Sequence, residues 1–157
     1  KKRYKRSRCY SLDIEREGLE KDEFDKDCYI GNINFLEKII NKVDCIVAGS
    51  VLTHLSWEQI VLLLDKLSPL FSQGGEFGFS FFNGKNYNLY SKIDKDLHGK
   101  ILTGFYHVVE LPLEYLENYC HEKKLKLDLL DYSFDLDHHI VYDGKTFARQ
   151  SFCNIKK

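Results

Sequence analysis

Two histidines stand where a titratable side chain could do chemistry. His54 follows the apolar run Val43–Ala48, and His107 closes a polar, tyrosine-rich stretch. An imidazole titrates near neutral pH, so either residue could accept a proton as a general base. The alternative for each is structural: His54 anchors its turn, or His107 packs within its own loop. The sequence leaves both interpretations open.

A second group of potential ligands lies near the end of the chain, at Asp135, Asp137, His138 and His139. Adjacent residues of a strand point to opposite faces, so these two histidines would rarely share one ion. The five cysteines are scattered, odd in number and form no C-x-x-C pair. We therefore expect no metal, a solvated loop at 135–139, and the reduced cysteines of a cytoplasmic protein.

Apolar runs predict the strands that would position these residues. The strands are expected at Cys9–Leu12, Cys28–Ile33, Val43–Ala48, Glu76–Phe82, Leu125–Phe134 and Thr146–Ile155. A continuous apolar run such as Val43–Ala48 is typical of a parallel strand buried on both faces. Asp143-Gly144 separates the last two strands and favours a tight turn. These two strands are therefore predicted to form an antiparallel hairpin.

Helical signals fall between the strands. Ser56 and Gln59 match a capping box, and apolar residues at helical spacing continue to Phe71. The pair Gly74-Gly75 is expected to end this helix. Further helices are predicted at Phe35–Asn41 and at 112–124, with a turn or short helix at Ile14–Leu19.

The order of elements predicts a single α/β domain with a mostly parallel sheet and right-handed crossovers. A length of 157 residues suits one domain. Between the fourth strand and the last helix, Asn83–Glu110 is polar and long. A connection of this length is expected to be a lid or insertion that carries function.

The third strand leads into a distinctive turn. An acid and an apolar strand precede Ser50-Val51-Leu52-Thr53-His54-Leu55. This pattern resembles the fourth strand and following loop of class I, Rossmann-like S-adenosylmethionine-dependent methyltransferases. Strand Phe77–Phe82 resembles their fifth unit, and Gln150-Ser151-Phe152 resembles their seventh strand. The resemblance implies a three-layer αβα sandwich with an antiparallel C-terminal hairpin.

One part of the family pattern is missing from this sequence. In dinucleotide-binding folds, the acid that binds ribose follows a glycine-rich loop by about 20 residues. Only twelve residues precede Asp13, and none of them is glycine. The first strand and its loop are therefore expected upstream of Lys1. Without that strand two edges would be open, so we expect this piece alone to be poorly stable and inactive.

The resemblance implies a site for S-adenosylmethionine. Asp13 corresponds to the acid that binds both ribose hydroxyls, since a carboxylate offers two acceptors to a diol. Asn32 with Ile33 corresponds to the pair near the adenine. The methionine portion would lie against the backbone of the loop 48–52, with Ala48, Gly49, Ser50 and Val51. Structural alternatives stay open: Asp13 caps a helix, Asn32 is a turn residue, and Ser50 caps its turn.

The implied reaction is methyl transfer to a hydroxyl or amine of a small molecule. Tyr87 and Tyr106 are candidate substrate-binding residues, and His54 and His107 are candidate bases. Aromatic side chains in this stretch could equally close it onto the core. The alternatives are a non-catalytic methyltransferase-like binding module and a nucleic-acid methyltransferase.

Bulk composition bears on the partners. The formal net charge is -1, whereas nucleic-acid-binding proteins usually carry a basic excess. Basic residues do gather in Lys1–Arg8, but no aromatic or glycine interleaving extends this patch. No apolar run approaches the roughly 18 residues of a membrane helix. We therefore expect a small-molecule methyl acceptor, no membrane partner and no nucleic acid.

Overall fold

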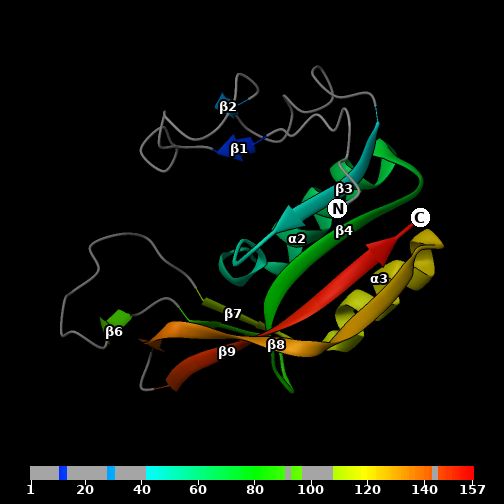
Figure 1. Ribbon diagram of the computed structural model, residues 1–157. Helices are drawn as coiled ribbons and strands as arrows, with labels where there is room; N and C mark the ends of the chain where they lie inside the picture. Colours follow the sequence, from blue (N-terminus) through cyan, green and yellow to red (C-terminus); the bar gives the residue numbers. More distant parts are fainter. Residues whose placement is uncertain (1–10, 14–27, 31–41, 91–92, 97–107, 143–144) are drawn as a thin grey trace. The chain divides into compact units, whose positions relative to one another are not determined.

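The computed structural model describes residues 11–13, 28–30, 42–90, 93–96, 108–142 and 145–157 (Figure 1). Side chains are described at 42–90, 108–130, 145 and 149–157. The chain divides into two compact units, Lys1–Asn41 and Lys42–Lys157.

The first unit contains two short parallel strands. β1 spans Ser11–Asp13 and β2 spans Cys28–Ile30, with Asp13 paired to Ile30. Both strands fall within or beside the predicted runs, and Asp13 is the last residue of β1. The predicted helices at 14–19 and 35–41 lie outside the described residues.

The second unit is built on a mixed sheet. Its long strands are β3 (Val43–Ala48), β4 (Phe71–Asn83), β8 (Lys126–Tyr142) and β9 (Lys145–Lys156). β3 runs parallel to β4, while β9 runs antiparallel to both β4 and β8 and lies between them. The shorter strands are β5 (Asn88–Tyr90), β6 (Ile93–Asp96) and β7 (Val108–Leu111). The predicted α/β class and C-terminal antiparallel hairpin are confirmed.

Two helices of the second unit follow the predicted signals. α2 spans Trp57–Leu67, and Ser56 and Gln59 form the predicted capping box. α3 spans Leu113–Lys123 directly after Pro112. The 3₁₀ turns are η3 (Leu52–His54) and η4 (Ser68–Leu70). α2 ends four residues before the predicted Phe71, because Pro69 has no N–H to continue the helical hydrogen bonds. Among the described residues, no helix is long and apolar enough to cross a bilayer.

The strand boundaries correct two predictions. β4 begins at Phe71 rather than Glu76, and Gly74 adopts φ 77° within it. The β3–β4 register shifts at this point, so the two glycines form an irregularity inside the strand instead of ending a helix. β8 continues to Tyr142, so 135–139 lies in a strand and not in a solvated loop. Pairing with β9 and β6 explains this extension.

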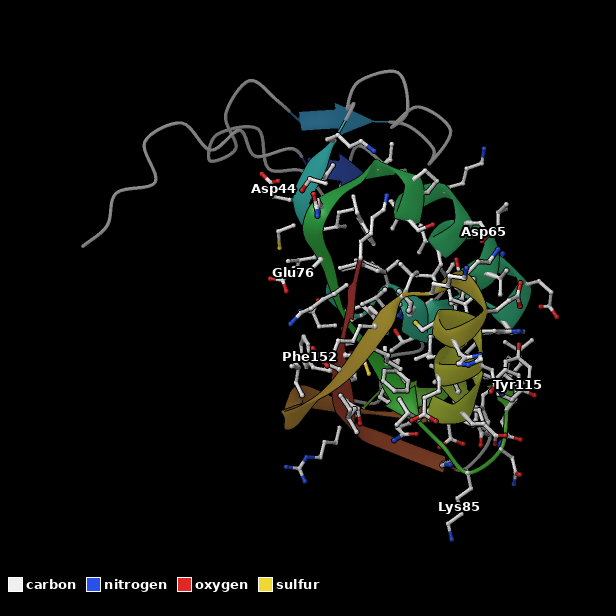
Figure 2. The ribbon with its side chains drawn as sticks, turned by 90° about the vertical axis from the view of Figure 1, so that its right-hand side faces the viewer. Asp44, Asp65, Glu76, Lys85, Tyr115 and Phe152 are labelled. Carbon is white, nitrogen blue, oxygen red and sulfur yellow. The ribbon has the colours of Figure 1, made fainter. Side chains whose placement is uncertain are left out.

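The sheet buries one face under the helices. Phe77, Phe79 and Phe81 alternate along β4 and are at most 1% exposed. They share the core with residues of α2, α3 and β9, among them Ile60, Leu64, Leu116, Cys153 and Ile155. Figure 2 shows Glu76 and Phe152 on the side of the sheet away from α3. The helix face thus holds the apolar core of this unit.

The glycines of β4 provide a test of this packing. A Cβ on Gly75 would lie 2.8 Å from the Val43 carbonyl oxygen, whereas one on Gly78 would meet nothing within 4 Å. We predict that Gly75→Ala lowers the free energy of unfolding by about 1–3 kcal/mol, since backbone must move to admit the methyl group. Gly78→Ala, in the same strand, is the matched control and should change stability little. Urea denaturation of both variants checks this; equal effects would contradict the strand geometry.

Candidate functional site

The carboxyl ends of β3 and β4 lie at the same edge of the sheet, because the two strands are parallel. Open α/β sheets bind ligands outside this edge. β3 ends at Ala48 and the chain then turns through 49–51 into η3. Gly49 is exposed, Ser50 is half-buried and Val51 is 44% exposed, so solvent reaches this turn.

Ser50 holds the turn in an unusual conformation. Its φ is 58°, in the left-handed region that costs residues other than glycine about 1–2 kcal/mol. The Ser50 N–H donates to Ser80 Oγ at 2.7 Å, and the Ser50 carbonyl accepts from Thr53 Oγ1 at 2.6 Å. The Ser50 hydroxyl donates to Gln150 Oε1 at 3.2 Å and accepts from Gln150 Nε2 at 3.0 Å. Strain supported in this way is concentrated at functional sites.

The described residues leave the turn uncrowded at Gly49. A Cβ built on Gly49 would meet no atom within 4 Å. Ser80 and Gln150 are 1% and 2% exposed, and both form hydrogen bonds with Ser50 of the turn. The turn is thus held by buried polar groups, and the role predicted for Ala48–Val51 against the methionine portion of the cofactor stays a prediction.

His54 lies at the end of η3. Its neighbours Leu52 and Thr53 are each 1% exposed, and its own N–H donates to the Val51 carbonyl at 3.2 Å. η3 contacts both β4 and β7. The imidazole is half-buried on an anchored turn next to the strand edge. These contacts fix the backbone at His54, and its role as a catalytic base stays a prediction beside the alternative that it anchors its turn.

Tyr87 packs against the start of the helices. Its hydroxyl accepts a hydrogen bond from the Trp57 N–H at 3.3 Å, and its ring stacks on Tyr115 with 6.0 Å between centroids. Trp57 contacts the edge of Tyr115 at 5.2 Å. These contacts match the structural alternative, in which the aromatic side chain closes its segment onto the core. A role for Tyr87 in acceptor binding stays a prediction.

One further predicted site residue falls among the described residues. Asp13 ends β1 in the first unit. Asn32, Ile33, Tyr106 and His107 lie outside the described residues.

A buried acid that the sequence analysis missed lies on β7. Glu110 is 8% exposed and forms an ion pair with Lys145 at the start of β9. The Tyr90 hydroxyl donates to Glu110 Oε2 at 2.7 Å, and Asn88 Nδ2 approaches the same oxygen at 3.4 Å. The available signal was an acid inside the apolar run Val108–Leu111. The cluster joins β5, β7 and β9 near η3.

The electrostatics of this cluster favour its charged form. Burial opposes ionisation of Glu110, but the hydrogen bonds from Lys145 and Tyr90 outweigh it and hold the pKa of the carboxyl below its ordinary value. The hydrogen bond with Glu110 raises the pKa of Lys145. Burial and Glu110 raise the pKa of Tyr90. At neutral pH the cluster is therefore a carboxylate, an ammonium and a neutral phenol.

Comparison with known proteins shows the fold. No protein-family model and no curated protein matches the sequence. A SAM-dependent methyltransferase from Methanosarcina mazei matches in structure with TM-score 0.62 and 12% identity over 93% of this chain and 80% of that one. One from Archaeoglobus fulgidus gives TM-score 0.57 and 12% identity over 93% and 74%.

A third match has ligands bound. It is the 1,6-didemethyltoxoflavin-N1-methyltransferase of Burkholderia thailandensis, with 1,6-didemethyltoxoflavin and S-adenosylhomocysteine. Its TM-score is 0.57 at 13% identity, over 83% of this chain and 50% of that one. Together with the inserted antiparallel β9, these matches show that the chain has the Rossmann-like fold of class I SAM-dependent methyltransferases.

The Glu110 cluster predicts a specific dependence of stability on pH. The folded pKa of Glu110 lies below its ordinary value of 4.5, so its contribution is present above that value and lost as pH falls through the folded pKa. We predict that Glu110→Gln lowers stability at pH 7 and flattens the loss of stability below about pH 4.5. Thermal unfolding between pH 3 and pH 7 measures this. Glu117→Gln, an exposed change on α3, is the matched control; an identical slope for both variants would refute the assignment.

Proposed function

We propose that this chain acts as an S-adenosylmethionine-dependent methyltransferase on a hydroxyl or amine of a small molecule. The observation that carries the proposal is the strained, solvent-accessible turn Ala48–Val51 at the carboxyl edge of a methyltransferase-like sheet. A binding turn at this edge is where such sheets hold their ligands.

The cofactor would be held by three segments. Asp13, the last residue of β1, would bind the ribose hydroxyls, and Asn32 with Ile33 would lie near the adenine. The backbone of Ala48–Val51 would lie against the methionine portion. The Burkholderia thailandensis enzyme with its bound S-adenosylhomocysteine supports this choice of cofactor.

The cofactor supplies the reactive methyl group. The chain would orient the cofactor and the acceptor and provide the electrostatic environment of the reaction. An acceptor hydroxyl must lose its proton, so His54 or His107 would act as the general base for such a substrate. A neutral amine can react before it loses a proton and needs a base less. Tyr87 and Tyr106 would line the acceptor side.

We also propose a small-molecule acceptor and a cytoplasmic location. The net charge of -1 favours a small-molecule acceptor over nucleic acid or a membrane surface. Cys45, Cys120 and Cys153 are free thiols, which suits the reducing cytoplasm. A binding module without catalysis is the competing proposal, and cofactor binding separates the two.

Calorimetry of the intact protein with S-adenosylhomocysteine tests the cofactor site. We predict a dissociation constant in the micromolar range and its loss in Asp13→Ala, because the ribose diol would lose both acceptors. Asp44→Ala is the matched control: this carboxylate bonds to Ser72 at the opposite end of β3, so its removal should leave binding unchanged. A folded wild-type protein that does not bind would favour the non-catalytic module.

The acceptor class can be tested at His54. For a hydroxyl acceptor, His54→Gln should lower kcat by a factor on the order of 10² or more, as expected for loss of a general base. The KM for S-adenosylmethionine should stay near the wild-type value. Steady-state kinetics over pH 6–9 would check this. The kcat of the wild type should fall toward acidic pH as the base is protonated, and this fall should be absent in His54→Gln. An unchanged kcat and profile would exclude His54 as the base.

A further inference from the structure

A buried glutamine lies directly behind the proposed cofactor turn. Gln150 is 2% exposed and lies within β9, five residues after the strand begins at Lys145. Its neighbour Ser151 pairs with Phe81, so Gln150 stands one residue further toward the carboxyl end of β4. The antiparallel course of β9 thus brings this amide to the edge where β3 ends.

The Gln150 amide is committed to one partner. Its Oε1 and Nε2 lie 3.2 Å and 3.0 Å from the Ser50 hydroxyl, which both donates and accepts. Of the buried side-chain N and O atoms described, only Asn154 Oδ1 lacks a hydrogen-bond partner, so the Gln150 amide is satisfied. A buried amide bonded at both of its polar atoms is held in place, because moving it away from Ser50 would leave those atoms unsatisfied.

The backbone at Ser50 needs such support. The left-handed region is disfavoured for serine, and the other two hydrogen bonds hold only the Ser50 peptide groups. Gln150 is the partner that acts on the side chain, and it comes from 100 residues away in the sequence. It therefore ties the conformation of the turn to the position of β9.

We propose that Gln150 is a positioning residue: it locks Ser50 in the left-handed conformation and so fixes the backbone that would bind the cofactor. The conformational part depends only on the contacts above, and the effect on cofactor affinity rests on the proposed function. Gln150 does not need to touch the cofactor to act in this way.

The test uses Gln150→Met, which keeps the length of the side chain and removes both hydrogen bonds. Asn154→Leu is the matched control on the same face of β9: its amide bonds to Glu76 at the far end of the strand. We expect amide hydrogen exchange at Ser50, whose N–H donates to Ser80, to quicken in Gln150→Met and to stay unchanged in Asn154→Leu. Unchanged exchange at Ser50 in Gln150→Met would overturn the proposal.

A rescue variant separates positioning from simple packing. Glycine adopts a positive φ at no steric cost, so adding Ser50→Gly to Gln150→Met should restore stability relative to Gln150→Met alone. If Gln150 only filled space, Ser50→Gly would change stability by the same amount in wild type and in Gln150→Met, because the gain from glycine would not depend on residue 150. If Gln150→Met does not fold, Ser50→Ala tests the same pair from the other side, with the same expected rise in exchange.

Affinity for S-adenosylhomocysteine completes the experiment. We expect Gln150→Met to weaken binding about tenfold, comparable to the strain that the turn must then overcome. If wild type binds and Gln150→Met binds equally well, the positioning role is wrong while the proposed function stands. If wild type does not bind, the proposed function fails, and the exchange and rescue results still decide the role of Gln150.

Discussion

The insertion of β9 between β4 and β8 is the constraint on which the second unit depends. β4 supplies the central row of buried phenylalanines, but its pairing with β3 alone would leave one edge open. β9 closes that edge along Glu76–Phe81 and at the same time carries β8. Because β9 is antiparallel, its early residues reach the carboxyl edge of the sheet. The edge that could bind a ligand is therefore built from β3 and β4, which come early in the unit, and from β9 at its end.

Two polar clusters lie at that edge, and residues of β9 take part in both. Gln150 reaches the turn after β3, and Lys145 reaches the buried carboxylate of Glu110 on β7. Removing one partner of either pair would leave a buried polar group unsatisfied, which is costly. The ion pairs at the opposite end, among Glu76, Lys156 and Asp128, are partly exposed and contribute little by comparison. The polar contacts at the carboxyl edge are thus better shielded from solvent than the ion pairs at the opposite end.

Local signals in the sequence predicted most of the elements. The capping box of Ser56, the apolar run of β3 and the turn signal before β9 depend on neighbours in sequence, and each gave the correct element. The start of β4 was wrong because Gly74-Gly75 favours a turn, and only pairing with β3 keeps it in a strand. The length of β8 was missed for a similar reason, since its outer half is stabilised by β9 and β6.

The candidate site was predictable only in part. The turn at 48–51 followed from its place after an apolar strand and from the family resemblance. The expected burial of that strand on both faces was wrong, since no residue of β3 is buried and Val47 is 73% exposed. The left-handed Ser50 and its partner Gln150 could not be predicted, because a hydrogen bond across 100 residues leaves no local pattern. Glu110 was hidden for the same reason: its partners Tyr90 and Lys145 come from other strands.

Amide chemical-shift mapping of the intact protein with S-adenosylhomocysteine would show whether the turn after β3 binds the cofactor. We predict that the largest shifts in the second unit fall on Gly49, Ser50 and Val51, with smaller ones at Ser80. Saturating ligand that leaves these amides unmoved, or that shifts only the opposite end of the sheet around Glu76 and Lys156, would contradict it.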